Sequence, residues 1–257
     1  MVIIRAGYPI SARKKEIGVT MKIAIGIISY FPADENVREN RKEGLRRLLK
    51  QLVQYFPDQD VLICAQCWTP DEELEMRNIH PKLFIFNHEK GLGIPMCRIK
   101  LRDIFLNQTD YDYMLMFDDD AEINTTFEQA QNYLRMMEEH PEGFSVLQGH
   151  FNDPLGHYDP AQLNGAAFSR FILEKENWDE NWSVQNPTIG VFDDVMYVYT
   201  CHYKYPQYEF IVNGFFCTQW SKPQRKSIST WLDAKLGRAI YNNTKQKLYE
   251  LKQKYKK

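Results

Sequence analysis

The sequence has no apolar run of the roughly 18 residues that a membrane-spanning helix requires. Its formal net charge is only −2, so no overall attraction to nucleic acid or to a membrane is expected. Cysteines are few and odd in number, five in all, and most of them lie inside apolar runs. That pattern indicates reduced, buried thiols in a cytosolic protein. Cys64 and Cys67 have CxxC spacing, but no second pair accompanies them, so a zinc or redox site is not favoured.

The sequence also shows no internal repeat, no low-complexity tract and no signal peptide. A short apolar start precedes basic residues at the amino terminus, which is the reverse of the order in a signal peptide. We expect residues 1–20 to be an extension ahead of the domain. Residues 21–221 would form one α/β domain, since 257 residues with 44% hydrophobic side chains suffice for a large core. Residues 222–257 would form a basic helical segment that packs on this domain or extends from it.

The most informative stretch is YDYMLMFDDDAE, residues 111–122. Residues 113–117 form an apolar run of the length expected for a strand buried on both faces. Three carboxylates follow directly: Asp118, Asp119 and Asp120. Like charges packed this closely repel each other, and a bound Mg²⁺ or Mn²⁺ would relieve the repulsion because hard cations prefer carboxylate oxygens. The alternative is a solvated acidic turn after a core strand.

Strand and helix patterns alternate before this stretch. Isoleucine-rich residues 21–30 and residues 60–67 and 82–87 read as strands, and residues 39–55 and 71–79 read as helices. This order predicts a parallel sheet with right-handed crossovers. The loop GLGIP and a helix with a basic face come next. Arg98 and Lys100 on that helix would meet an anion beside free backbone N–H groups, or would be ordinary solvated charges.

The second half of the chain has fewer clear patterns. Thr125 or Thr126 is expected to cap a helix that runs to about residue 139, and residues 144–148 read as a strand. The stretch GVFDDVM contains Asp193 and Asp194, and an aromatic segment typical of a β structure continues from it to about residue 220. Leucines at helical spacing and many lysines mark the last residues as a basic amphipathic helix. Such a helix suits a polyanion, a membrane surface or a partner, or it packs with a solvated lysine face.

Taken together, these features resemble the GT-A fold of nucleotide-sugar glycosyltransferases, and the inverting, family-2-like members most of all. The resemblance is carried by the segments IAIGIISYFP, GLGIPMCR, MLMFDDDAE, which is similar to the DxD signature, and GVFDDV, which is similar to the downstream acidic motif. The segment Asn164-Gly165-Ala166 is similar to the small residues before the acceptor region. Asp193-Asp194 departs from the commoner Glu-Asp pair. The chain also lacks the Gln/Arg-rich tryptophan motif of processive synthases, which implies transfer of one sugar.

The resemblance implies a mostly parallel central sheet flanked by helices, and it assigns roles to individual residues. Asp118 and Asp120 would hold a Mn²⁺ or Mg²⁺ ion, with His202 as a further candidate ligand against the alternative of a structural histidine. The nucleotide sugar would contact six residues: Ser29, Tyr30, Arg98, Lys100, Asp118 and Asp119. Asp194 would take the proton from the acceptor hydroxyl, with Asp193 as the second candidate.

Other functions remain open on the sequence alone. A Mg²⁺-dependent nucleotidyltransferase would need a glycine-rich loop after the first strand, and IISYFPADEN contains no glycine. A sugar- or nucleic-acid-binding module without activity is the non-enzyme alternative. As acceptors we expect a surface glycan, a lipid-linked oligosaccharide, or a hydroxymethylated or glycosylated DNA base. The protein would then be cytoplasmic, in a bacterial or phage-infected cell, or peripheral to the membrane.

Overall fold

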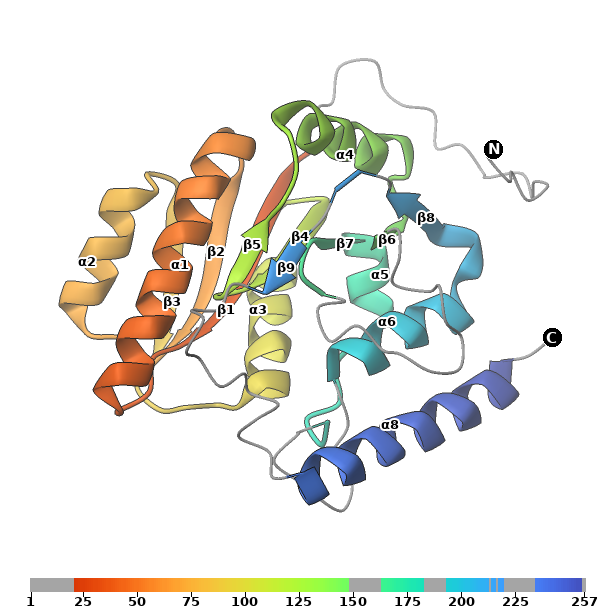
Figure 1. Cartoon of the computed structure of the whole chain (residues 1–257). Coiled ribbons are helices and arrows are strands. Elements are labelled where there is room, and N and C mark those ends of the chain that lie inside the picture. The colour runs from red at the N-terminus through yellow and green to blue at the C-terminus, as the bar shows by residue number, and fades with distance from the viewer. Residues whose placement is uncertain are drawn as a thin grey trace.

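The computed structural model describes residues 21–147, 163–182, 193–212, 214–215, 217–219 and 234–255. The expected extension of residues 1–20 lies outside these ranges. The described residues form a central sheet with helices on both faces (Figure 1). The α/β architecture expected from the sequence is therefore confirmed.

The central sheet has seven strands in the order β3-β2-β1-β4-β7-β6-β8. Strands β1 to β4 are parallel, β7 runs antiparallel to both of its neighbours, and β8 is parallel to β6. The sheet is thus mostly parallel with one reversed strand. The strands are β1 (Ile23–Tyr30), β2 (Asp60–Gln66), β3 (Leu83–His88), β4 (Tyr113–Asp118), β6 (Phe144–Leu147), β7 (Ala166–Ser169) and β8 (Glu209–Val212). Two short strands, β5 (Ala121–Ile123) and β9 (Cys217–Gln219), pair separately.

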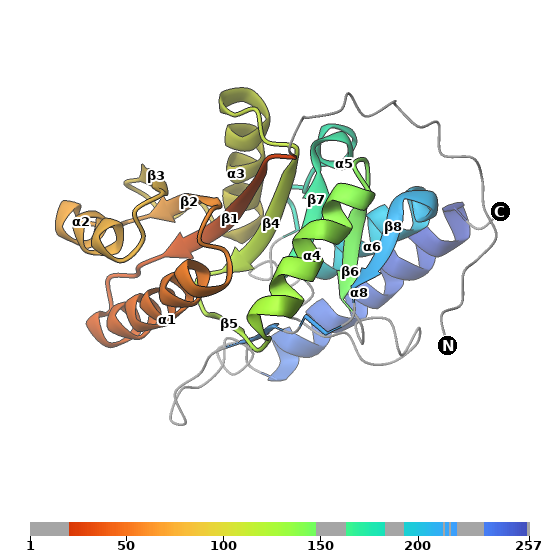
Figure 2. The ribbon, with the colours of Figure 1, turned by 90° about the horizontal axis from the view of Figure 1, so that it is seen from above.

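Helices cover both faces of the sheet (Figure 2). One face is covered by α1 (Glu35–Tyr55), α2 (Pro70–Ile79) and α4 (Phe127–Glu139). The other face is covered by α3 (Ile94–Gln108), α5 (Arg170–Lys175) and α6 (Asp193–Lys204). A 3₁₀ turn at Pro206–Tyr208 leads into β8, and the last helix, α8, spans Ala234–Tyr255.

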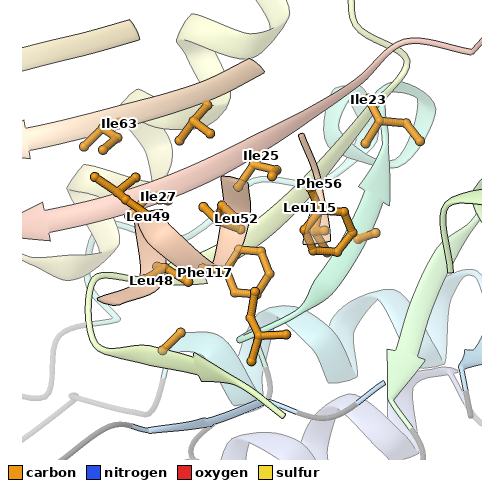
Figure 3. Packing of buried hydrophobic residues seen from close by; sticks show 14 of the residues in the cluster. Ile23, Ile25, Ile27, Leu48, Leu49, Leu52, Phe56, Ile63, Leu115 and Phe117 are labelled. Carbon is orange, nitrogen blue, oxygen red and sulfur yellow. The ribbon is translucent and has the colours of Figure 1, made fainter. Parts of the chain in front are cut away.

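Alternation along β1 feeds two separate apolar cores. Ile25 and Ile27 point to the α1 side, where they lie near Leu48, Leu49 and Leu52 (Figure 3). Ala24 and Ile28 point to the α3 side. A side-chain period of two explains the division, because successive residues of a strand face opposite sides of its sheet. Full burial of one such leucine contributes about 1.5–3 kcal/mol to the free energy of unfolding, so the α1 stripe fixes this helix on the sheet.

Capping residues fix where the helices start. The side chain of Asp34 accepts a hydrogen bond from the backbone N–H of Val37, so α1 begins at Glu35, four residues earlier than the apolar pattern predicts. Thr69 and Thr126 form capping boxes at the starts of α2 and α4. The expected cap at Thr125 or Thr126 is thus confirmed at Thr126. The start of α1 was missed because its first turns carry no apolar stripe.

Residues 193–204 form a helix, which corrects the β structure predicted for the first part of the aromatic segment, whereas β8 and β9 confirm strands in its later part. Helix α6 is apolar on several sides because it is buried between two layers. Tyr197, Val198 and Cys201 pack toward the sheet, whereas Val195 and Tyr199 pack toward α8. A helix buried on opposite sides has no single polar face, so its periodicity is hidden, and its β-branched and aromatic residues mimic a strand.

The basic C-terminal segment forms the expected helix, α8, and it packs on α6. Leu248 is buried against Val195, Met196 and Tyr199 of α6, with Leu251 partly buried beside it. In Figure 1, α8 lies alongside α6, on the side toward which the parallel strands point. In the described part of the chain, no helix is long and apolar enough to cross a membrane.

We expect a side chain at Gly26 of β1 to be accommodated only if the side chain of Met114 shifts. A Cβ atom there would lie 2.7 Å from Sδ and 2.9 Å from Cγ of Met114, inside the α3-side core. Gly26→Ala should lower the free energy of unfolding by about 1–3 kcal/mol, the usual cost of overpacking a dense core. Urea unfolding measures this cost in the wild type and in a Met114→Ala background, where the space is open. An equal cost in both backgrounds would contradict the packing explanation, because contacting residues should be non-additive.

Candidate active site

The carboxyl ends of three parallel strands meet at one edge of the sheet. Strand β1 ends at Ser29 and Tyr30, β2 at Gln66, and β4 at Asp118. The open α/β sheets of nucleotide-binding proteins place their ligands at this edge. The first turn of α6 adds Asp193 and Asp194, both buried. The two acidic motifs of the sequence therefore belong to one site.

Asp119 points into the protein rather than toward a ligand. Its Oδ2 atom accepts hydrogen bonds from the Ser29 hydroxyl at 2.9 Å and from the backbone N–H of Tyr30 at 3.2 Å. Its Oδ1 atom accepts a hydrogen bond from Arg41 of α1 at 2.6 Å. Asp119 is 2% exposed. This carboxylate links the ends of β1 and β4 to α1. Asp119 and Ser29 therefore have a structural role, whereas the sequence predicted only a contact with the nucleotide sugar for them.

Arg41 is a site residue that the sequence reading missed. The same nitrogen that binds Asp119 lies 3.3 Å from Oδ2 of Asp120. The signal was present in the spacing, because Arg38 and Arg41 continue the buried stripe of Leu45 and Leu48 toward the start of α1. A basic residue on the apolar face of a helix needs a buried acidic partner. Here that partner is the acidic turn.

Arg98 joins the two acidic motifs. Its Nη2 atom donates a hydrogen bond to Oδ1 of Asp118 at 3.2 Å. Its Nε atom lies 2.9 Å from Oδ2 of Asp193, an ion pair without the alignment of a hydrogen bond. The side chain of Arg98 is 5% exposed, whereas that of Asp118 is 26% exposed. Arg98 is thus a buried bridge between carboxylates, not the solvated charge that was one of its two expected states.

The loop before β7 holds the end of β4 in place. The side-chain Oδ1 atom of Asn164 accepts a hydrogen bond from the backbone N–H of Asp118 at 2.7 Å, and Asn164 is buried. The next residue, Gly165, has a φ of 84°, a backbone conformation that favours glycine, and its N–H donates to the carbonyl of Met116. The small-residue segment of the sequence therefore orients the first carboxylate of the acidic turn.

Burial raises the pKa of both carboxyls on α6. The pKa of Asp194 rises to about 8, because burial penalises its charged form and the neighbouring Asp193 charge adds to the penalty. Burial also raises the pKa of Asp193, although the Arg98 guanidinium opposes that rise. Asp194 is therefore protonated in a large share of molecules at neutral pH. A carboxyl with this pKa is suited to proton transfer near neutrality.

The GLGIP loop lies against the end of β1. The N–H of Leu92 donates a hydrogen bond to the side-chain Oε1 of Gln66 at 2.6 Å. Gly93 has a φ of 80° and caps α3 without a side chain. Gly91 lies so near the Tyr30 ring that a Cβ atom on it would be 3.4 Å from that ring. Tyr30 is 43% exposed, so an aromatic face borders the site beside this loop.

Two predicted site residues are not brought to this cluster. Lys100 is exposed and follows Arg98 by two positions on α3, which puts it on a different face of the helix. His202 lies in the last turn of α6, and its Nδ1 atom is 2.5 Å from Oε2 of Glu209. Eight residues of helix separate it from Asp194, which is about 12 Å along the axis. His202 thus pairs with an acidic residue away from Asp118 and Asp120.

The acidic turn offers carboxylates to a metal ion but does not form a complete site. No group of three or more His, Cys, Asp or Glu side chains among the described residues is arranged to hold a metal. Mg²⁺ is usually held by one or two carboxylates, with substrate phosphates and water completing its shell. Asp118 and Asp120 fit that partial arrangement. All five cysteines are free thiols, and Cys64, Cys97 and Cys201 are buried.

Comparison with solved structures identifies the fold. The crystal structure of S. aureus TarS 1–349 in complex with UDP matches over 91% of this chain and 70% of that one, with a TM-score of 0.53 and 14% identity. A mycobacterial protein matches over 82% and 74%, with a TM-score of 0.51 and 10% identity. A putative glucose-1-phosphate thymidylyltransferase from Bacillus anthracis, in complex with a sucrose, matches over 86% and 95%, with a TM-score of 0.50 and 11% identity.

These likenesses show a GT-A-like fold. The expected fold is thereby confirmed. In two further TarS structures, the chain spans only 54% and 34% of the other chain. No protein-family model matches the sequence, and no curated protein is significantly similar to it.

The raised pKa of Asp194 predicts a pH-dependent effect of Asp194→Asn on stability. Between the unfolded pKa and about 8, the folded protein binds the extra proton. The contribution of Asp194 is therefore fully present below its unfolded pKa and is lost as pH rises through its folded pKa. Asparagine does not ionise, so the melting temperature of Asp194→Asn relative to wild type should increase from pH 5 to pH 9. The corresponding difference in the free energy of unfolding should change by about 1.4 kcal/mol per pH unit at most.

Thermal unfolding at each pH without added metal measures this difference. Asp193→Asn is the control, since it removes a partner of the buried Arg98 and should lower the melting temperature at neutral pH. A difference between Asp194→Asn and wild type that does not change with pH would contradict the assigned pKa.

Proposed function

We propose that the protein transfers one sugar from a nucleotide-diphosphate donor to an acceptor hydroxyl, with inversion at the anomeric carbon. The observation that carries this proposal is the Arg98 bridge between Asp118 and Asp193. It joins an acidic turn suited to a diphosphate and its metal ion with a pair of buried carboxyls suited to proton transfer. A sugar transferase needs its diphosphate-binding groups and its proton acceptor close enough together to act on one bound donor.

The donor would occupy the edge of the sheet formed by β1, β4 and the GLGIP loop. Tyr30 offers an exposed aromatic face, and Asp118 is the most exposed carboxylate of the turn. Asp118 and Asp120 would hold a Mn²⁺ or Mg²⁺ ion together with the donor's two phosphates. The ion, when bound, supplies Lewis-acid stabilisation of the charge that develops on the leaving diphosphate. The complex of the structurally similar TarS with UDP supports a nucleotide-diphosphate donor.

Asp194 would accept the proton of the acceptor hydroxyl. Inversion by direct displacement requires one such base on the acceptor side, and a carboxyl with a pKa of about 8 becomes a capable base once it ionises. Asp193 is less suited, because its carboxylate already pairs with Arg98. Helix α6 fixes Asp194 from a fully buried first turn, which supports accurate positioning.

A nucleotidyltransferase is the alternative within this fold, and one similar structure is a putative thymidylyltransferase. That chemistry needs backbone N–H groups of a glycine-rich loop after the first strand to cradle the triphosphate. The connection between β1 and α1, residues 31–34, contains no glycine. The products separate the two activities, since a nucleotidyltransferase releases pyrophosphate and a glycosyltransferase releases the nucleoside diphosphate.

For the acceptor, we propose an anionic molecule or an anionic carrier surface that contacts α8. The last 24 residues of the chain contain eight basic residues and one acidic residue, so they carry +7, and the rest of the chain carries −9. Lys245 and Lys254 are exposed on α8, as is Tyr249. The opposite charges of the two parts would orient the molecule on a polyanion.

The proposed roles predict different losses in two matched variants. Asp120→Asn removes a metal-binding carboxylate, so the affinity for UDP in the presence of Mn²⁺ should fall to its metal-free value. Asp194→Asn should keep that affinity and lose transfer by about 10²- to 10⁴-fold, the usual contribution of a general base. Titration calorimetry with UDP, with and without Mn²⁺, measures the affinities, and a panel of nucleotide sugars measures transfer. An equal affinity of the wild type for UDP with and without Mn²⁺ would contradict the proposed donor site.

Charge reversal on α8 tests the acceptor side. Lys245→Glu/Lys254→Glu should weaken binding to anionic lipid vesicles or to duplex DNA, and the wild-type affinity for that ligand should fall with added salt. Lys50→Glu/Lys100→Glu is the matched control, because it changes two exposed helical lysines by the same charge elsewhere. Wild-type protein that binds neither ligand at low salt, or equal loss in both variants, would mean that the α8 lysines only face solvent.

A further inference from the structure

Arg41 occupies one side of the acidic turn. It reaches the turn from α1, and one of its nitrogens lies 2.6 Å from Asp119 and 3.3 Å from Asp120. Its side chain is 17% exposed, against 3% and 2% for the two carboxylates. We propose that Arg41 is a built-in counter-ion that competes with the divalent cation for Asp120. This inference rests on the proposed metal-dependent transfer.

The two contacts of Arg41 are unequal, and that inequality lets one of them open. The contact with Asp119 is short, and Asp119 is held independently by Ser29 and Tyr30 through its other oxygen. The contact with Asp120 is longer by 0.7 Å and is made by the same nitrogen. A small movement of the guanidinium would therefore break its contact with Asp120 while Asp119 keeps its arginine. Arg41 is in this sense a positioning residue for the turn and a competitor at its outer carboxylate.

Charge explains why the competition matters. A divalent ion at Asp120 would approach the Arg41 guanidinium as a like charge in a site with little water, so each cation disfavours the other. The donor's diphosphate adds negative charge, which would offset the repulsion between the two cations. The donor-free protein should therefore bind the metal weakly, and the donor and the metal should bind together.

The alternative is that Arg41 is only a structural clamp, in which case its removal would disorder the turn and weaken metal binding. Helix α1 offers a matched control for that possibility. Arg47 lies on the same helix and donates a hydrogen bond at 2.9 Å to Glu122, just beyond the acidic turn. Glu122 belongs to β5 and is not among the proposed ligands. Removal of Arg47 changes the charge of α1 equally without touching Asp120.

The experiment titrates Mn²⁺ into the full chain and follows free Mn²⁺ by electron paramagnetic resonance, with and without UDP. Without UDP, Arg41→Gln should bind Mn²⁺ more tightly than wild type by at least about tenfold, because the variant removes a positive charge close to the cation. Arg47→Gln should match wild type. With UDP, the advantage of Arg41→Gln should shrink. Equal or weaker Mn²⁺ binding by Arg41→Gln without UDP would overturn the proposal.

Arg41→Lys keeps the positive charge but has one ammonium group instead of a planar fork, so it should hold Asp119 and lose reach to Asp120. It should bind Mn²⁺ more tightly than wild type and more weakly than Arg41→Gln. Should Arg41→Gln fail to fold, Arg41→Lys decides: wild-type affinity in this variant overturns the proposal. The UDP arm separates the two hypotheses. Wild type that binds no Mn²⁺ even with UDP overturns the metal-dependent donor site and this inference with it. UDP-dependent Mn²⁺ binding with unchanged Arg41 variants overturns this inference alone.

Discussion

The neutralisation of buried carboxylates is the constraint on which this site depends. Five aspartates, from the end of β4 and the first turn of α6, gather where a sheet ends, and four of them are almost completely buried. Their mutual repulsion would drive the two elements apart. Arg41 and Arg98 prevent this from the two faces of the sheet, since α1 covers one face and α3 the other. Burial penalises the charged form of Asp194, and the excess of five acids over two positive charges adds to that penalty, so Asp194 keeps a proton near neutral pH.

The same imbalance connects structure to function. A site that retains excess negative charge attracts a cation, and it accepts a diphosphate only when that cation accompanies it. A cation near the turn would also lower the pKa of Asp194, because a positive charge favours the ionised form. Donor binding would then prepare the base for the acceptor. In the proposed mechanism, loading of the donor and activation of the base would be coupled through charge, with no change of fold.

Much of this arrangement could be predicted from the sequence, because buried parallel strands and their acidic ends leave local patterns. The strand before Asp118 followed from such patterns, and the association of its turn with Asp193 and Asp194 followed from the family resemblance. The contacts that neutralise the turn did not, since Arg41 is 78 residues and Asn164 46 residues from their partners. Helix α6 was misread as β structure because it is buried on opposite sides. Lys100 was placed by its nearness to Arg98 in sequence, although a helix turns neighbours to different faces.

The burial of α6 has a further consequence for how the acceptor is recognised. Its first turn carries Asp194, and its outer side packs against Leu248 of α8, so one helix connects the proposed base to the basic surface. A polyanion held by α8 would have its position relative to Asp194 set by this packing rather than by a flexible loop. In this arrangement, the charge on α8 would bind the anionic carrier, and the geometry of α6 would determine which hydroxyl lies near Asp194. Such a division needs few specific contacts to the acceptor, since orientation alone supplies much of the rate advantage in a two-substrate reaction.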